Sequence, residues 1–115
     1  MNDDCLFCKI AAKQIASKQV YEDELAFAFH DIEPGAPVHV LIIPKEHISS
    51  LREVDESKTS ILGHLLVVAN KIAKQLGVSE SGYRVAINAG PDAGQAVDHL
   101  HLHLLGGRRL KWPPG

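Results

Sequence analysis

The pattern of apolar and polar residues along this chain predicts one long helix and five short strands. Between residues 55 and 77, apolar side chains recur every three or four positions, at Ile61, Leu65, Val68, Ile72 and Leu76. This spacing places them on one face of a helix that begins near Asp55 and ends at Gly77. Runs rich in β-branched and aromatic residues predict strands over residues 20–22, 25–29, 38–43, 83–88 and 98–105.

A second, shorter helix is predicted near the N-terminus, where Leu6, Phe7, Ile10 and Ala11 fall at helical spacing. The segments 30–37 and 89–97 contain prolines and glycines and are predicted to be loops. Parallel strands need long crossover connections, and this chain has too few helices to supply them. We therefore expect an α+β fold with a mostly antiparallel sheet, in a single domain over residues 1–115.

The last predicted strand carries three histidines, His99, His101 and His103, that alternate with leucines. Side chains alternate faces along a strand, so the histidines share one face and the leucines share the other. The leucine face is predicted to lie in the core. A strand face that only meets solvent usually carries Thr, Lys or Glu, so the histidine face is a candidate functional surface.

Two kinds of chemistry suit this face. Neighbouring histidines of the run, which are two residues apart, can share a metal ion. His99 and His103 are separated by about 13 Å along a strand, at roughly 3.3 Å per residue, so all three histidines cannot converge on one ion. Alternatively, one imidazole acts as a nucleophile while its neighbours handle protons and phosphate charge. Just upstream, the loop 89–97 contains Gly90 and Gly94, whose backbone amides are candidates for binding phosphate.

Composition narrows the function classes. The chain has 115 residues, with 12 Lys+Arg against 14 Asp+Glu and seven histidines. Without an excess of basic residues, tight binding to nucleic acid or to an anionic membrane is not expected. The N-terminus is acidic, and no apolar run is long enough to span a membrane, which predicts a cytoplasmic protein. In that compartment Cys5 and Cys8 are expected to be free thiols or metal ligands.

These motifs resemble the histidine triad (HIT) proteins, and most closely the Hint branch of purine nucleoside phosphoramidases. The resemblance rests on the histidine run 99–105, on Gly94-Gln95 before it and on Gly106-Gly107 after it. It extends over nearly the whole chain, through segments 7–10, 28–32, 43–49, 62–65, 82–84 and 112–115.

The resemblance implies a hydrolase that cleaves the P–N bond of purine nucleoside 5′-phosphoramidates, or acyl- and aminoacyl-adenylates. His101 would be the nucleophile and would carry the nucleotide covalently until water releases a nucleoside monophosphate. His103 and His39 would orient the site and help to transfer protons, and His99 belongs to the catalytic set unless it binds a metal. No cofactor is required for this reaction.

The same resemblance implies a nucleotide-binding set. Asp31 would accept hydrogen bonds from the ribose, Asn88 would line the site, and the loop amides of Gly94, Gln95 and Ala96 would bind phosphate oxygens. The purine would be enclosed by apolar residues, which are Leu6, Phe7, Ile10, Phe29 and Ile32. For these five, ordinary core packing is the alternative explanation.

Two residues depart from the family pattern. Ala96 stands where this branch usually carries Ser or Thr, so a hydroxyl that would bind the phosphate or the leaving group is missing. We expect weakened activity for this reason. Asp98 stands where an aromatic residue commonly precedes the first histidine, and strand alternation predicts that it points to the leucine side.

Cys5 and Cys8 form a C-x-x-C motif, and a zinc site would need two further ligands, for which histidines are the natural candidates. The resemblance implies that these are His47 and His99, which would make His99 a structural ligand. The alternative is a pair of thiols with no metal. The two remaining histidines, His30 and His64, have no predicted chemistry.

The resemblance also implies a homodimer whose sheet continues across the two-fold axis, with the C-terminal tail 108–115 near the partner's active site and Trp112 reaching towards it. Two other functions stay open. One is a dinucleoside polyphosphate hydrolase of the related Fhit branch, against which the tail argues. The other is a nucleotide-binding regulator with little turnover, which Ala96 favours.

Overall fold

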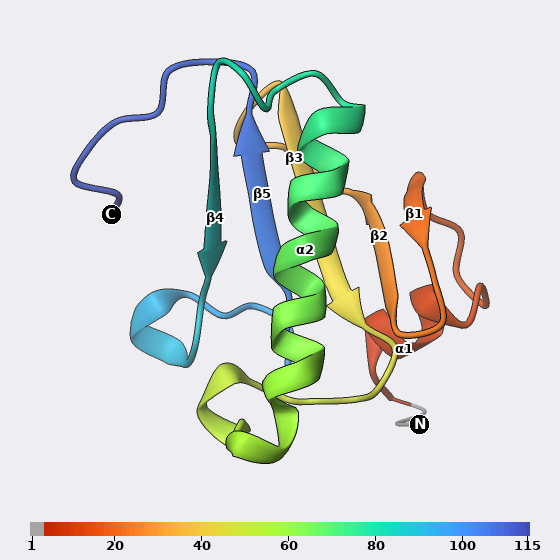
Figure 1. The fold of residues 1–115 in the computed structure, drawn as a ribbon. Helices are drawn as coiled ribbons and strands as arrows, with labels where there is room; N and C mark the ends of the chain where they lie inside the picture. The colour runs from red at the N-terminus through yellow and green to blue at the C-terminus, as the bar shows by residue number, and fades with distance from the viewer. Residues whose placement is uncertain (1–3) are drawn as a thin grey trace.

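The computed structural model describes residues 4–115, and a five-stranded sheet forms its centre (Figure 1). The strands are β1 (Gln19–Glu22), β2 (Ala26–His30), β3 (Val38–Pro44), β4 (Tyr83–Ile87) and β5 (Leu102–Gly106). Their order in the sheet is β1-β2-β3-β5-β4, and each neighbouring pair is antiparallel. The predicted α+β architecture with an antiparallel sheet is confirmed.

One face of the sheet is covered by the long helix α2 (Thr59–Gln75), which lies across the strands (Figure 1). The helix buries four members of the predicted stripe, Ile61, Leu65, Val68 and Ile72, while Leu76 lies just beyond its end and is partly buried. The side chains of the sheet that meet the helix are Ala26, Ala28, Val40, Ile42, Leu102 and Leu104. Full burial of an aliphatic side chain such as Leu102 or Leu104 contributes about 1.5–3 kcal/mol. These leucines therefore fix the orientation of β5, and the histidine side of the strand faces away from α2.

The opposite face is covered at one end by the short helix α1 (Leu6–Ala11). Phe7, Cys8 and Ile10 of this helix are buried in a second apolar cluster. The sheet contributes Phe27, Phe29, Leu41 and Ile43 to the same cluster. Because side chains alternate along β3 and β5, His39 and His103 lie on this face too. The sheet thus has a mainly apolar side under α2 and a mixed side that carries the candidate chemistry.

Two element boundaries differ from the prediction. Asp55 caps a 3-10 turn over Glu56–Lys58, where its Oδ1 accepts a hydrogen bond from the Ser57 amide at 2.9 Å, and α2 begins only at Thr59. The end of α2 agrees with the prediction, because Gly77 adopts a φ of 76° just after the last turn. No helix among residues 4–115 has both the length and the apolarity that a membrane span requires.

The other difference concerns the histidine strand. It was expected to start at residue 98, but the hydrogen-bonded ladder of β5 starts at Leu102. Only His103 of the three histidines lies in the ladder, opposite Leu41 of β3 and Ala86 of β4. His99 and His101 lie in an irregular segment that leads into the strand. The start of the β5 ladder coincides with the end of β4, because Ile87 is the last residue of β4 and lies opposite Leu102.

Candidate active site and zinc centre

In the segment before β5, side chains alternate between the two faces as they would in a strand, although this segment is not part of the hydrogen-bonded ladder. Leu100 is buried under α2, while His99 and His101 are buried on the side of α1. One backbone bond holds the segment to the neighbouring chain, from the Leu100 amide to the Ile48 carbonyl at 2.6 Å. A second bond runs from the His99 amide to the Val97 carbonyl at 2.9 Å. Asp98 is exposed.

The tautomer of His101 is fixed by a single hydrogen bond. Its Nδ1 lies 2.7 Å from the backbone carbonyl oxygen of His99. A carbonyl can only accept, so Nδ1 carries the proton and the neutral ring keeps its lone pair on Nε2. The ring of Phe7 packs edge-on against the imidazole, with centroids 5.1 Å apart and an interplanar angle of 88°. His101 is therefore a buried, oriented imidazole with one free basic nitrogen.

His39 and His103 form a second oriented unit. The Gly35 amide donates to His39 Nδ1 at 2.9 Å, so a neutral His39 carries its proton on Nε2. That nitrogen lies 2.9 Å from Nδ1 of His103, which accepts the hydrogen bond. The proton of His103 is then on Nε2, a buried atom that has no partner among residues 4–115. Since the rings of His101 and His103 are 5.0 Å apart, this N–H is a donor beside the candidate nucleophile.

Burial controls the charge of His103. Removal from water is the largest of the causes that lower the pKa of its imidazole to about 4; the neighbouring His101 and His39 also lower this pKa, while Asp31 opposes them. The ring is therefore neutral near pH 7. A neutral His103 can donate from Nε2 and accept at Nδ1 at the same time, which is what the hydrogen-bonded chain from Gly35 requires.

Asp31 lies at the end of this chain, with Oδ2 at 3.4 Å from His39 Nε2. Its Oδ1 accepts the Glu33 amide at 2.8 Å, which fixes the carboxylate in the loop after β2. A cavity of about 470 Å³ adjoins these groups, a size typical of small-molecule sites. Its lining includes Lys18, His30 and Ile32 as well as Asp31 and His39.

Asp31, His39 and His103 also bring three metal-ligating atoms within 4.8 Å of one another. The hydrogen bond from Gly35 argues against a metal there. It occupies the Nδ1 lone pair of His39, so a neutral ring has a proton on the nitrogen that would have to bind the ion. We interpret this group as a hydrogen-bonded unit.

The loop before the histidines is held by the side chain of Gln95. The amide oxygen accepts the Gly90 N–H at 3.1 Å, and the amide nitrogen donates to the carbonyls of Ser49 and Val97 at 2.7 and 3.0 Å. Gln95 thus uses both ends of its amide inside the protein. Its role is to position the loop, and this side chain has little capacity left for a substrate.

The backbone amides of the loop are partly used as well. The Gly94 N–H donates to Pro91 and the Gln95 N–H donates to Gly90, at 3.0 and 3.1 Å. Each amide has one proton, so of the three amides predicted to bind phosphate only that of Ala96 has no such bond. The next two amides, of Val97 and Asp98, share this property within the described part of the chain. All three residues line a cavity of about 540 Å³ together with Leu6 and His47.

The predicted purine-binding residues divide into two groups. Phe7, Ile10 and Phe29 are at most 7% exposed and pack in the second apolar cluster, so core packing accounts for most of their surface. Leu6 and Ile32 are 45% and 92% exposed, at the two separate cavities. These two have apolar surface available for a ligand.

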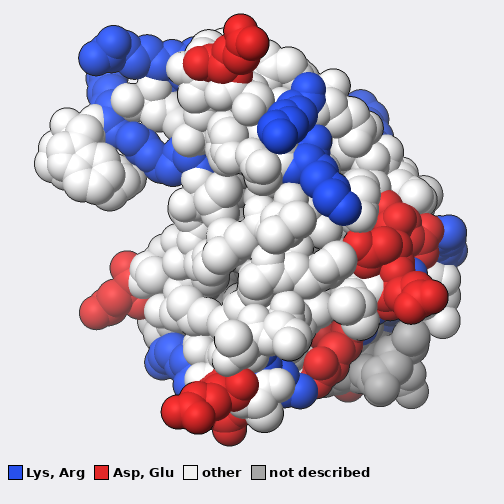
Figure 2. All heavy atoms as spheres, in the orientation of Figure 1, with Lys and Arg blue, Asp and Glu red and all other residues white. Residues whose placement is uncertain are grey.

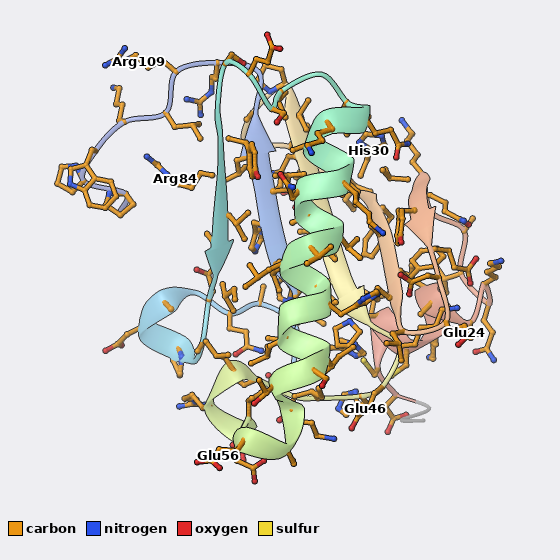
Figure 3. All side chains as sticks on the ribbon, viewed as in Figure 1. Glu24, His30, Glu46, Glu56, Arg84 and Arg109 are labelled. Atoms are coloured by element: carbon orange, nitrogen blue, oxygen red, sulfur yellow. The ribbon has the colours of Figure 1, made fainter. Side chains whose placement is uncertain are left out.

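Asn88 follows β4, in phase with Ala86, which pairs with His103. Strand alternation therefore places Asn88 on the histidine side. Trp112 is 78% exposed in the C-terminal tail, where its ring lies 5.7 Å from the guanidinium carbon of Arg84. Arg84 projects from β4 towards this tail (Figure 3).

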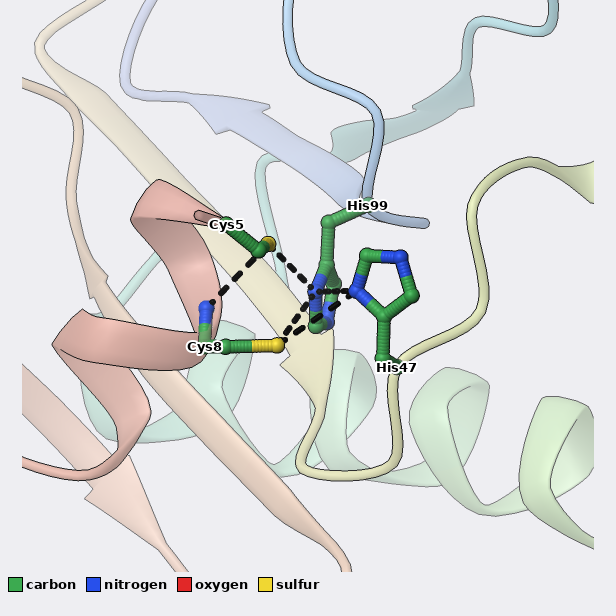
Figure 4. A group of neighbouring side chains, drawn as sticks. All are labelled: Cys5, Cys8, His47 and His99. Carbon is green, nitrogen blue, oxygen red and sulfur yellow. Dashed lines mark hydrogen bonds between the residues drawn. The ribbon is translucent and has the colours of Figure 1, made fainter. Parts of the chain in front are cut away.

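Cys5, Cys8, His47 and His99 come together from three separate parts of the chain (Figure 4). Nδ1 of His99 lies 3.2 Å from Cys5 Sγ, 3.6 Å from Cys8 Sγ and 3.2 Å from His47 Nδ1. Cys8 Sγ and His47 Nδ1 are 3.4 Å apart. A tetrahedral zinc ion with bonds of about 2.0–2.3 Å places its ligands roughly 3.3–3.8 Å from one another. The cluster therefore fits a structural zinc ion.

The protonation of His99 supports the same conclusion. Its Nε2 lies 2.9 Å from the Pro44 carbonyl, to which it must donate, so the lone pair is on Nδ1 and faces the two sulfur atoms. Burial lowers the pKa of His99 to about 4, which keeps the ring neutral. A neutral imidazole whose second nitrogen donates to a carbonyl is the usual form of a zinc ligand. Both ring nitrogens of His99 therefore interact with groups other than His101: Nε2 with the Pro44 carbonyl and Nδ1 with the cluster.

Sequence reasoning missed the backbone groups that orient these rings, which are the amide of Gly35 and the carbonyls of Pro44 and His99. Every residue carries these groups, so residue type gives no signal for them. Only the tertiary structure shows which ones meet a side chain. The packing of Phe7 against His101 was missed for a similar reason, because the resemblance pointed only to the purine.

The chain belongs to the HIT domain family, whose sequence profile matches residues 12–110. The fold agrees: the crystal structure of a HIT family hydrolase from Legionella pneumophila superposes with a TM-score of 0.96 at 49% identity, covering 97% of this chain and 100% of that one. An uncharacterized HIT-like protein of Synechococcus elongatus is 52% identical over the full length of both chains. A 14 kDa zinc-binding protein of Zea mays is 54% identical over 96% of this chain and 87% of its own length.

Proposed function

We propose that this protein is a nucleotide hydrolase that cleaves the P–N bond of purine nucleoside 5′-phosphoramidates, or the corresponding bond of acyl- and aminoacyl-adenylates. The observation that carries this proposal is the fixed tautomer of His101. The bond from its Nδ1–H to the His99 carbonyl leaves Nε2 as a nucleophile. The likeness to HIT family hydrolases supports the class of reaction.

In the first step, the lone pair of His101 Nε2 forms a bond to the α-phosphorus, and the electrons of the P–N bond leave with the amine. The departing amine takes up a proton from water, and the Nε2–H of neutral His103 donates a hydrogen bond beside the nucleophile. The hydrogen bond from His39 holds His103 in the tautomer that presents this N–H. The amides of Ala96 and the two residues after it are available for the phosphate oxygens.

In the second step, water attacks the phosphorus of the nucleotidyl-histidine and the P–Nε2 bond breaks. The products are a nucleoside monophosphate and the free imidazole of His101. Division into two displacements lowers the barrier of each, because the enzyme holds both reacting groups in place. Asp31 beside the 470 Å³ cavity is the acceptor for the ribose hydroxyls in this scheme.

The zinc ion has no step in this reaction. When bound by Cys5, Cys8, His47 and His99 it supplies a structural cross-link between α1, the turn after β3 and the segment before β5. Free thiols that serve as metal ligands also fit the predicted cytoplasmic location, where disulfides are rare.

Rapid mixing with adenosine 5′-phosphoramidate followed by intact-mass measurement tests the reaction directly. We expect a transient adduct of one adenylyl group on His101, and none in the His101→Ala variant. Hydrolysis of diadenosine triphosphate in preference to the phosphoramidate would instead assign the Fhit-type reaction. AMP binding with no adduct and no turnover would indicate a nucleotide-binding regulator, the function that the missing hydroxyl at Ala96 favours.

The dimer belongs to the same proposal. β4 pairs only with β5, so its other side is a free edge among the described strands. Leu66 and Val67 of α2 are 50% and 54% exposed, and the surface around α2 in Figure 2 is largely uncharged. A two-fold partner would cover this apolar surface and extend the sheet. The tail 108–115, with Trp112, would then lie near the partner's site. Gel filtration that gives only a 12.5 kDa species would contradict the dimer.

A further inference from the structure

His99 links the zinc cluster and the candidate nucleophile through two different groups. Its ring donates to Pro44 and directs Nδ1 to the cluster. Its carbonyl oxygen accepts the hydrogen bond that fixes the tautomer of His101, at 2.7 Å. Any rotation of the His99 peptide group therefore changes the orientation of the His101 ring.

The segment that carries these two residues has few backbone hydrogen bonds. It precedes the ladder of β5, and the backbone bonds that hold it are those of Leu100 to Ile48 and of His99 to Val97. The ring of His99 is fully buried, and apart from Pro44 its polar contacts are the other three cluster residues. The cluster is thus a principal anchor for the backbone next to His101.

Helix α1 supplies a second connection. Phe7 lies in the chain between the ligands Cys5 and Cys8, and its ring meets the His101 ring edge-on at 5.1 Å and the His99 ring at 6.0 Å. Helix α1 has only six residues, which is too short to be stable alone. Ligation of both cysteines would therefore fix the position of Phe7, and with it one wall of the His101 pocket.

We infer that the zinc cluster of Cys5, Cys8, His47 and His99 positions the nucleophile, through the His99 carbonyl and through Phe7. This inference rests on the proposed function of His101. The four ligands and Phe7 act as positioning residues, since the reaction proceeds at His101. Misplacement of a reacting group by about 1 Å can cost roughly a hundredfold in rate, so a modest shift of the His99 peptide is sufficient for a large effect.

The two properties of the site should respond differently to loss of zinc. The rate of adenylyl transfer to His101 should fall by about tenfold to a hundredfold, because the imidazole loses its fixed orientation. The affinity for AMP should fall by a smaller factor than the rate. Asp31, the proposed ribose acceptor, lines a cavity that contains none of the cluster residues. Only the proposed phosphate-binding amides share a cavity with Cys5 and His47.

The experiment compares the zinc-loaded full chain with the same protein after removal of zinc by a chelator and after addition of zinc. Long-range ¹H–¹⁵N spectra of histidine-labelled protein report the tautomer of His101 without reference to activity. We expect a single Nδ1–H form with zinc, a mixture of tautomers without it, and recovery on addition of zinc. Single-turnover adenylyl transfer and AMP titrations are measured on the same samples.

His47→Asn provides a test without a chelator, because His47 is the partly exposed ligand and its loss leaves the three buried ligands in place. His64→Asn is the matched control, since it removes an imidazole of α2 whose partner is Asp23, outside the cluster. We expect the tautomer mixture and the slow transfer in His47→Asn alone. An unchanged His101 tautomer or an unchanged transfer rate in the zinc-free, folded protein would overturn the inference.

General unfolding on zinc removal, seen as loss of the amide signals of β3 and β5, would also overturn it, because zinc would then determine the fold and not the nucleophile. Failure of the proposed function looks different from either result. In that case no adenylyl adduct forms on His101 even in the zinc-loaded protein, while the effect of zinc on the tautomer can still be observed.

Discussion

The loop 90–97 and the histidine segment 99–103 are neighbours in the chain, but the loop offers backbone groups to a ligand and the histidine segment offers side chains. In the histidine segment, backbone groups such as the His99 carbonyl orient the rings, and the side chains are the reactive groups. In the loop, the side chain of Gln95 holds the backbone, and the free amides are the groups offered to a ligand. Substitutions should therefore act on chemistry in the first region and on positioning in the second.

The largest effect is expected from His101→Ala. The variant loses the nucleophile but keeps Leu100 and Leu102 in the core, so the rate should fall by about 10⁴-fold or more with little change in stability. Steady-state hydrolysis of adenosine phosphoramidate and thermal melting measure the two properties. A residual rate within tenfold of that of the unmodified protein would contradict the claim that the side chain of His101 is the reactive group of the histidine segment.

Ala96→Ser tests the loop from the other direction, because it adds a side-chain donor where only backbone amides are free. A hydroxyl that binds the phosphate or the leaving group should stabilise the transition state by about one to a few kcal/mol, which raises kcat about five- to a hundredfold. The variant Ala96→Val, which adds bulk without a donor, is the control. Equal rates for the unmodified protein and Ala96→Ser would contradict this account of the departure at position 96.

Gln95→Ala should damage the loop without touching the substrate. It removes three hydrogen bonds and leaves the Gly90 amide and the carbonyls of Ser49 and Val97 without their partner. We expect a loss of about 1–3 kcal/mol in the free energy of unfolding, measured by urea denaturation. Exposed Gln75, at the end of α2, is the control site for the same substitution. Full stability with reduced AMP affinity would instead make Gln95 a direct ligand contact.

The smallest effect concerns pH. His103 has a pKa of about 4 in the folded protein, below its ordinary value of 6.5. Between these values the unfolded chain binds a proton that folded His103 does not, so the free energy of unfolding should fall as the pH is lowered from 6.5 to 4. The groups facing His103 are His101, His39 and Asp31. Urea denaturation at pH 7 and pH 5 should show a smaller difference in His103→Asn, and an equal difference would contradict the assignment.

Two histidines outside the site show how far residue type alone can be interpreted. The sequence predicts no chemistry for His64, whose Nε2 lies 2.6 Å from Asp23 Oδ2 and connects α2 to the turn between β1 and β2. Burial tends to raise the pKa of Asp23, but hydrogen bonds from the Leu25 and Ala26 amides, Tyr21 and His64 lower it to about 2. The sequence contained no signal for this pair, because its two members are 41 residues apart.

The strand that was assigned least accurately is also the functional one. Alternation of histidine and leucine correctly predicted which side chains face α2. Burial of a side chain depends on the direction in which it points, and this direction alternates along an extended chain whether or not its backbone pairs with a neighbouring strand. The predicted start at residue 98 was wrong, because pairing depends on whether a neighbouring strand is present, and β4 ends at Ile87, opposite Leu102.

The sequence by itself determined the fold class and the side of β5 that carries the histidines, and it marked Cys5 and Cys8 as candidate metal ligands. These follow from periodic burial and from residue types that few other roles require. Only the tertiary structure decided which nitrogen of each histidine is free, which loop amides are already used, and how the zinc cluster reaches His101. Such properties depend on backbone donors and acceptors, which are the same in every residue and acquire a partner only when distant segments meet.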